Sequence, residues 1–198
     1  MASVLDLLSG SIDENTVHQM AKQLGANDQA TEQALSAAMP MLLGALGKNT
    51  STPEGANALM GALDRNHDGS ILDDVMGYMS DPATMNDGAK ILGHILGGKE
   101  GTVENGIAQV TGLDKKTVAQ LMTMAAPLVM GALAREKKEQ NMNAQDMAAM
   151  LQQERESTEK KLTGLAAMLD MDGDGDVTDD LSVLGSSLLG SFFGRKRS

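Results

Sequence analysis

The chain has 198 residues, 2% aromatic residues, no cysteine and a formal net charge of −11 at pH 7. This length fits one compact domain or two small ones, and the lack of cysteine excludes a disulfide framework and a thiolate metal site. The acidic balance argues against binding driven by nucleic acid phosphates. No run approaches the roughly 18 apolar residues of a membrane span. The N-terminus lacks the basic and apolar regions of a secretory signal, so we expect a cytoplasmic protein.

The first predicted element is a helix over residues 12–24. Ser11 and Glu14 have the spacing of a capping box, in which the side chains of both residues accept hydrogen bonds from backbone amides at the helix start. Gly25 is the expected left-handed residue that ends this helix.

A second predicted helix begins after this glycine and extends to about Leu46. Asn27 or Asp28 is the expected N-cap. Pro40 lies inside the helix, where it removes one backbone hydrogen bond, so we expect an interruption or a kink there.

The third predicted helix begins at Pro53 and Glu54, which suit a first helical turn, and ends at Leu63. An acidic loop follows. Asp73 and Asp74 lie where the next helix is expected to begin, because carboxylates are favourable at a helix N-terminus.

Later in the chain the same signals return. Gly112 predicts a helix end, Asp114 the next N-cap, and Pro127 a second internal proline. No run alternates apolar and polar residues as a strand does. The sequence therefore predicts an all-α, multihelical fold.

An internal repeat organises these elements into two copies. Residues 5–46 align with residues 92–133 at a constant shift of 87 without a gap. The second copy then gains 19 residues around 135–161, a charged stretch that suits a surface helix. We therefore predict a first repeat over residues 1–91 and a second over residues 92–198, each large enough to carry a core or share one.

Each copy contains an acidic loop, at residues 64–74 and 170–180. Both loops read D-x-[ND]-x-D-G-x-[IV]-x-D-D, which is the first half of an EF-hand calcium loop with its turn glycine at position 6. In the first acidic loop the candidate ligands are Asp64, Asn66, Asp68, the Ser70 carbonyl, and Asp73 or Asp74. In the second acidic loop they are Asp170, Asp172, Asp174, the Asp176 carbonyl, and Asp179 or Asp180.

Both loops depart from an EF-hand at position 12, where Val75 and Leu181 replace the bidentate glutamate. We therefore expect added water ligands and weak Ca²⁺ binding. The second acidic loop is the better candidate, because it has six carboxylates without a basic residue, whereas Arg65 lies in the first. The alternative is that both loops are solvated Asp-Gly turns whose last carboxylates complement a helix N-terminus.

Four segments together resemble a known family: residues 38–46, residues 53–63, the loop that follows, and residues 91–98. Their sequences are similar to the YidB-like bacterial family of uncharacterised proteins, most closely over residues 5–98 and less tightly to Leu133. The resemblance implies a multihelical fold with homeodomain-like helical elements. It supplies no catalytic residue, because the family has no established activity. The charged insertion and the second acidic loop depart from shorter members.

The stretch from Ala108 through Gly112 to Leu121 also looks like a DNA-binding helix-turn-helix, and Ala21 and Gly25 begin the same pattern in the first copy. A recognition helix needs side chains that contact phosphates and bases. The candidates are Lys115, Lys116 and Gln120 in the second copy, and Asn27, Gln29 and Gln33 in the first. The net charge argues against DNA binding, and two helices that meet at a glycine corner are the favoured explanation of the pattern.

Other chemistry-bearing residues indicate no active site. The methionines at helix-core spacing are expected in the core, namely Met39, Met41, Met122, Met124 and Met130. His18, His67 and His94 are isolated, and the chain has no phosphate loop, nucleophile elbow or zinc motif. We therefore expect a protein that is not an enzyme.

The sequence leads to three hypotheses. The first is a non-enzymatic, calcium-binding helical protein that acts by interaction with a protein partner. The second is a self-associating scaffold, in which the glycine-rich segments 92–98 and 184–194 pack between chains and the acidic loops are structural. The third is a DNA-binding protein. The basic residues 195–197 could contact an anionic surface or a partner, but a frayed terminus is the favoured interpretation of this patch.

Overall fold

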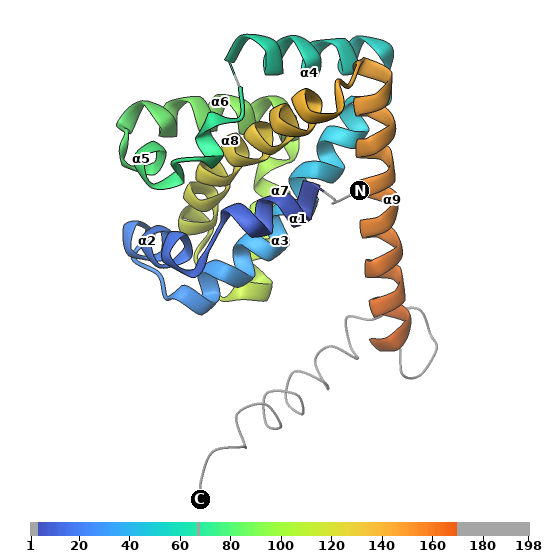
Figure 1. The fold of residues 1–198 in the computed structure, drawn as a ribbon. Helices are drawn as coiled ribbons and strands as arrows, with labels where there is room; N and C mark the ends of the chain where they lie inside the picture. Colours follow the sequence, from blue (N-terminus) through green and yellow to red (C-terminus); the bar gives the residue numbers. More distant parts are fainter. Residues whose placement is uncertain (1–3, 67, 170–198) are drawn as a thin grey trace, which may run out of the picture. The chain divides into compact units, whose positions relative to one another are not determined.

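The computed structural model describes residues 4–66 and 68–169 of the chain (Figure 1). Within these ranges all regular secondary structure is helical, which confirms the all-α prediction. The helices are α1 (Val4–Ser11), α2 (Glu14–Leu24), α3 (Asp28–Asn49), α4 (Pro53–Asn66), α5 (Val75–Ser80), α6 (Pro82–Leu96), α7 (Glu100–Thr111), α8 (Lys115–Gln140) and α9 (Ala144–Leu169), with 3-10 turns η1 (Ser70–Leu72) and η2 (Gly97–Lys99).

The chain divides into two compact units, residues 1–155 and residues 156–198. The described part of the second unit is the continuation of α9 to Leu169. The first unit contains the packed core and both of the helical segments that the sequence repeat aligns.

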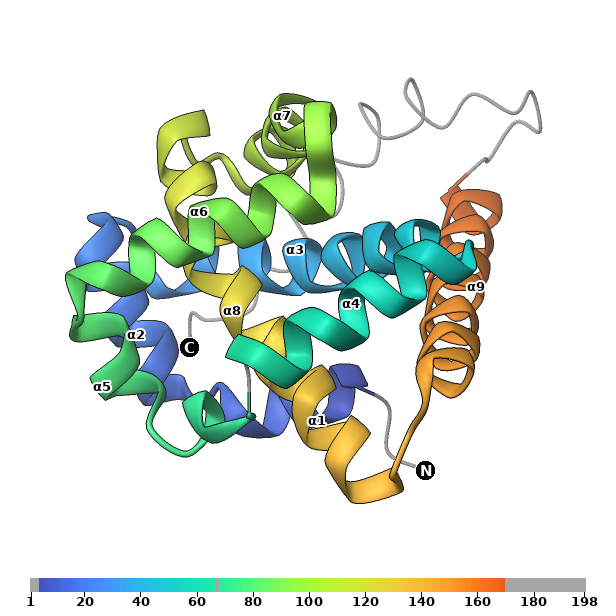
Figure 2. The same cartoon turned by 90° about the horizontal axis from the view of Figure 1, so that it is seen from above.

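Helix α8 is the centre of the first unit. Its residues are buried from Leu121 to Ala134, except for the half-buried Thr123, and α1, α3, α4, α6 and α7 pack on it. In Figure 2, α4 and α6 cross over α8. By length and composition α8 could cross a membrane, but 83% of its most apolar window is buried inside the protein. Its apolar character is therefore accounted for by its place in the core.

The two copies of the repeat share this core. The equivalent helices α3 and α8 pack against each other. Helix α1 of the first copy packs on α8 of the second, and α6, whose residues 91–96 align with residues 4–9, packs on α3 of the first. Asn49 of α3 donates a hydrogen bond from Nδ2 to the Ile95 carbonyl at 2.9 Å, where α6 ends. Each copy therefore covers the long helix of the other.

The start of α2 differs from the prediction. Ser11 belongs to the end of α1, where its hydroxyl donates to the Leu7 carbonyl. The N-cap of α2 is Asp13, whose carboxylate accepts hydrogen bonds from the Thr16 amide and hydroxyl. The capping box at Ser11 and Glu14 is therefore wrong, because two donors of Thr16 converge on one oxygen of Asp13.

The two glycine corners match the prediction. Gly25 and Gly112 both end a helix with left-handed backbone, at φ 66° and 72°. Asn27 then caps α3 and Asp114 caps α8, each through a side-chain oxygen that accepts an amide hydrogen bond three residues later. In each pair of helices, the left-handed glycine and the N-cap residue that follows it thus fix the turn.

Both long helices continue through their prolines. Helix α3 runs nine residues beyond Pro40 to Asn49, and α8 continues beyond Pro127 to Gln140. Neither helix is interrupted, because packing on both sides of the proline compensates for the lost hydrogen bond.

Four of the five predicted core methionines are buried, and one is not. Met41 is 43% exposed, so its predicted core position is wrong. The neighbours Met39 and Leu42 lie on the buried face of α3, and residue 41 falls between them on the outer side of the helix. At the edge of the apolar face, a shift of one residue turns a side chain from the core toward solvent.

The insertion of the second copy also enters the core. The first part of α9 buries Met147 and Leu151 completely. A methyl group on Gly47 of α3 would lie only 2.8 Å from the Leu151 carbonyl oxygen, so the two backbones are in close contact. The inserted residues therefore form more than a surface helix.

We predict that Gly88→Ala destabilises the fold by about 1–3 kcal/mol, the usual range for overpacking. A methyl group there would lie 2.0 Å from the Thr123 carbonyl oxygen, so α6 and α8 would have to separate. Urea unfolding measures the loss. Gly93→Ala is the control on the same helix, because its methyl group would make an ordinary 3.5 Å contact with Glu100. Equal stability of the two variants would contradict the close approach.

Candidate functional site

The first acidic loop begins where α4 ends and has a defined turn. Asp68 accepts hydrogen bonds from the Ser70 amide at 2.9 Å and from the Ser70 hydroxyl at 2.6 Å. These two bonds lower the pKa of Asp68 below its ordinary value, because they stabilise the carboxylate. Gly69 has left-handed backbone at φ 87°. The Ser70 carbonyl, a predicted ligand, accepts the Asp73 amide within the same turn.

Two basic residues of α8 hold this loop. Arg135 donates from Nη2 to the Gly69 carbonyl at 3.2 Å and to the Asp73 carboxylate, and Lys137 pairs with Asp64. Both basic side chains are mostly buried, at 28% and 18% exposure. The carboxylates at the two ends of the loop therefore already have cationic partners from another helix.

Close packing reinforces these polar contacts. A methyl group on Gly131 of α8 would lie 2.2 Å from Cγ2 of Ile71, and one on Gly69 would lie 3.3 Å from the Gly131 carbonyl oxygen. Leu72 is buried, at 8% exposure. Ile71 occupies the apolar position of the EF-hand pattern, and its side chain packs on α8.

The last predicted ligand has a different role. Asp74 is the N-cap of α5 and accepts the Gly77 amide at 2.8 Å, as the start of a helix was predicted here. No described group of three or more His, Cys, Asp or Glu side chains is close enough to hold a metal ion. The structure distributes Asp64, Asp68, Asp73 and Asp74 among separate partners. The side chain of Asn66 and the whole second acidic loop, residues 170–180, lie outside the described residues.

Beside the first acidic loop is a polar cavity of about 750 Å³. The carboxylates of Asp64 and Asp68 and the ammonium groups of Lys137 and Lys138 line it. Opposite charges thus face one another here.

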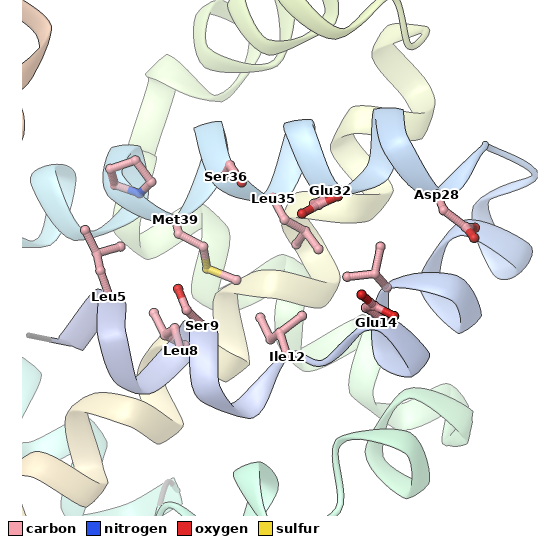
Figure 3. A pocket seen from close by; sticks show the side chains of 12 residues that line it. Leu5, Leu8, Ser9, Ile12, Glu14, Asp28, Glu32, Leu35, Ser36 and Met39 are labelled. Atoms are coloured by element: carbon pink, nitrogen blue, oxygen red, sulfur yellow. The ribbon is translucent and has the colours of Figure 1, made fainter. Parts of the chain in front are cut away.

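A second, more apolar cavity lies between α1, α2 and α3, and the sequence did not indicate it. This groove has a volume of about 620 Å³. Leu5, Leu8 and Ile12 extend into it from the α1 side, and Leu35 and Met39 extend from α3 (Figure 3). The other lining residues are Ser9, Glu14, Val17, Asp28, Glu32, Ser36 and Pro40.

Carboxylates form one end of this groove. Glu14 and Glu32 are exposed and lie toward the start of α2, and Asp28 lies farther along the same end (Figure 3). Asp28 pairs with His18 across the α2–α3 corner at 2.9 Å. Glu14 and Glu32 line the groove, and none of the other lining residues is basic. The groove therefore combines an apolar floor with negative charge.

The proposed recognition residues of the helix-turn-helix pattern are exposed, namely Lys115, Lys116, Gln120, Asn27, Gln29 and Gln33. Lys115 pairs with Glu104 of α7 at 3.6 Å, and the Asn27 side chain caps α3. From Leu121 to Ala134 α8 is almost entirely buried, so the middle of the helix is unavailable to a DNA groove.

Comparison with known proteins identifies a family. The family model of a bacterial protein of unknown function (DUF937) matches residues 6–136 and again residues 135–198. The first match includes both α3 and α8, in agreement with their packing in one core. No curated protein and no solved structure matches the chain.

We predict that Arg135→Gln loosens the first acidic loop and lowers its stability by about 1 kcal/mol. Most of this loss comes from the hydrogen bond to the Gly69 carbonyl, because the ion pair with the exposed Asp73 carboxylate contributes little. Amide hydrogen exchange over residues 69–73 should accelerate. Lys138→Gln is the control, since this exposed residue of α8 acts on the loop only through its charge near Asp68. Equal exchange in both variants would show that the contacts of Arg135 do not hold the loop.

Proposed function

The chain belongs to the bacterial DUF937 family, and we propose that it acts without catalysis, by binding a partner protein in the groove between α1, α2 and α3. The observation that carries this proposal is the groove itself. A cavity with an apolar floor and a few polar groups at its edge is the usual form of a binding site.

The polar groups around the groove fit binding better than catalysis. Its titratable side chains are carboxylates, and its hydroxyl groups are those of Ser9 and Ser36. No histidine or lysine lines the groove to activate either hydroxyl as a nucleophile. The leucine and methionine side chains provide the apolar contact that a partner helix or loop would bury.

We predict that a small aliphatic diazirine amino acid at position 36, a photo-crosslinker short enough to leave the groove open, forms a defined protein adduct in living bacterial cells. Ser36 is exposed and lines the groove, so a partner held there would lie within reach. The same amino acid at position 54 is the control, because Glu54 is exposed on α4 and does not line the groove. Denaturing gels and mass spectrometry identify the adduct. Equal adducts at both positions, or none at position 36, would contradict the proposal.

We further propose that the acidic loops bind Ca²⁺ weakly, with the second loop the stronger site. Two features of the first acidic loop support an EF-hand-like turn: Gly69 has the left-handed backbone that position 6 requires, and Asp68 holds the turn through Ser70. Arg135 and Lys137 compete with a cation for Asp73 and Asp64. The second acidic loop has more carboxylates and no internal basic residue.

For this second proposal we predict that Ca²⁺ raises the thermal unfolding midpoint above that in EDTA or Mg²⁺, because a ligand of the folded state stabilises it. Circular dichroism is the measurement. Asp172→Ala combined with Asp174→Ala should remove the part of the rise that the second acidic loop contributes, which is the larger part. Glu54→Ala combined with Glu139→Ala removes the same charge elsewhere and should preserve it. Identical curves in all three solutions would leave the loops as structural turns.

The glycine corners support a finer description of the fold. The α2–α3 and α7–α8 pairs each consist of a helix, a left-handed glycine, a capped start and a longer helix. We propose that these pairs are homeodomain-like elements whose second helices serve the core. Salt-sensitive retention on DNA would revive the nucleic-acid hypothesis.

A further inference from the structure

We infer that the partner bound in the groove is an amphipathic helix with leucine-like residues on one face and lysine or arginine residues beside them. This inference rests on the proposed function and specifies its partner class. Three observations carry it: the shape of the groove, the charge at one end, and the way α6 covers the equivalent face of α8.

The second copy shows that this face of the repeat accepts a helix. Ser36 of α3 is equivalent to Thr123 of α8 by the repeat alignment. Helix α6 packs on α8 there, so closely that a methyl group on Gly88 would lie 2.0 Å from the Thr123 carbonyl oxygen. In the first copy Ser36 is exposed and lines the groove. Gly88 belongs to the first part of α6, which precedes the aligned residues 91–96 and has no counterpart in α1. A helix from a partner would thus occupy a place on α3 that the first part of α6 occupies on α8.

The spacing of the groove residues also suits a helix. Leu5, Leu8 and Ile12 extend from one side, and Leu35 and Met39 from the other, with their side chains facing across the gap (Figure 3). Helix-in-groove binding uses apolar residues at positions i, i+3, i+4 and i+7, which form one continuous stripe. Such a stripe would bury the partly exposed side chains of Leu5 and Ile12.

Charge selects among the helices that fit. Glu14 and Glu32 are exposed at one end of the groove, and the net charge of the chain is −11. A basic helix would gain favourable contacts with both carboxylates and faster association, whereas an acidic helix would be repelled. A second copy of this acidic chain is disfavoured as the occupant for the same reason.

The test uses two labelled helical peptides of roughly 14 residues, a length at which an isolated helix is marginal and binding can stabilise it. Both have leucines in the i, i+3, i+4, i+7 pattern. One has lysine and the other glutamate at the remaining positions. Fluorescence anisotropy with the full chain at physiological ionic strength measures their affinities. We expect the lysine peptide to bind and the glutamate peptide to bind at least ten-fold more weakly, on the order of the usual charge discrimination.

Variants locate the binding. Ser36→Trp fills the groove and should abolish it. Glu14→Gln combined with Glu32→Gln should weaken the lysine peptide about three- to ten-fold. Glu54→Gln combined with Glu139→Gln makes the same change in net charge at exposed residues outside the groove and should leave affinity unchanged. Circular dichroism verifies that each variant remains folded.

The failures of the two proposals are distinguishable. In one outcome, Ser36→Trp abolishes peptide binding, but the peptide charge and the Glu14 and Glu32 substitutions have no effect. This result would overturn the basic partner and retain the groove as the binding site. Binding that Ser36→Trp leaves intact would overturn both. A dimer of the chain that Ser36→Trp dissociates, measured by light scattering, would replace the partner helix with a second copy.

Discussion

The burial of α8 is the constraint on which the rest of the structure depends. From Leu121 to Ala134 this helix is apolar on nearly every side, so water must be excluded all around it. A single neighbouring helix covers only one stripe. Helices from both copies of the repeat therefore surround it: α1, α2, α3, α4 and the first part of α6 lie in the first copy, and the end of α6 and α7 lie in the second. This requirement explains why the two copies form one core rather than two.

The environment of the first acidic loop follows from the same arrangement. The loop crosses the end of α8 where the helix emerges from the core and where Arg135 and Lys137 reach its carboxylates. Close contact between Gly69 and Gly131 fixes the loop independently of any bound ligand. A cation at this loop would have to compete with two ammonium or guanidinium groups that are largely withdrawn from water. The same sequence pattern can therefore give a weaker site in one copy than in the other.

The features that the sequence predicted correctly depend on neighbouring residues. Gly25 and Gly112 end their helices, and Asn27 and Asp114 begin the next, because each signal acts within one helical turn. At the start of α2, Ser11 and Asp13 are both suitable N-caps, and the local pattern selected Ser11 instead of Asp13. The partners of Asp64 and Asp73 lie more than sixty residues away on α8, and a local pattern contains no information about them. The groove was missed for a related reason: no helix was predicted for residues 4–11, and its placement depends on packing.

The groove is also a consequence of the burial of α8. Helix α1 packs on α8, which it must help to cover, and the face of α3 around Ser36 is left open on its other side. The equivalent face at Thr123 is covered, because α6 meets α8 through a glycine and extends further than α1 does. An apolar surface between two helices of an acidic protein is kept from self-association when carboxylates flank it. In the proposed complex, Glu14 and Glu32 would repel another copy of the acidic chain and attract a basic partner.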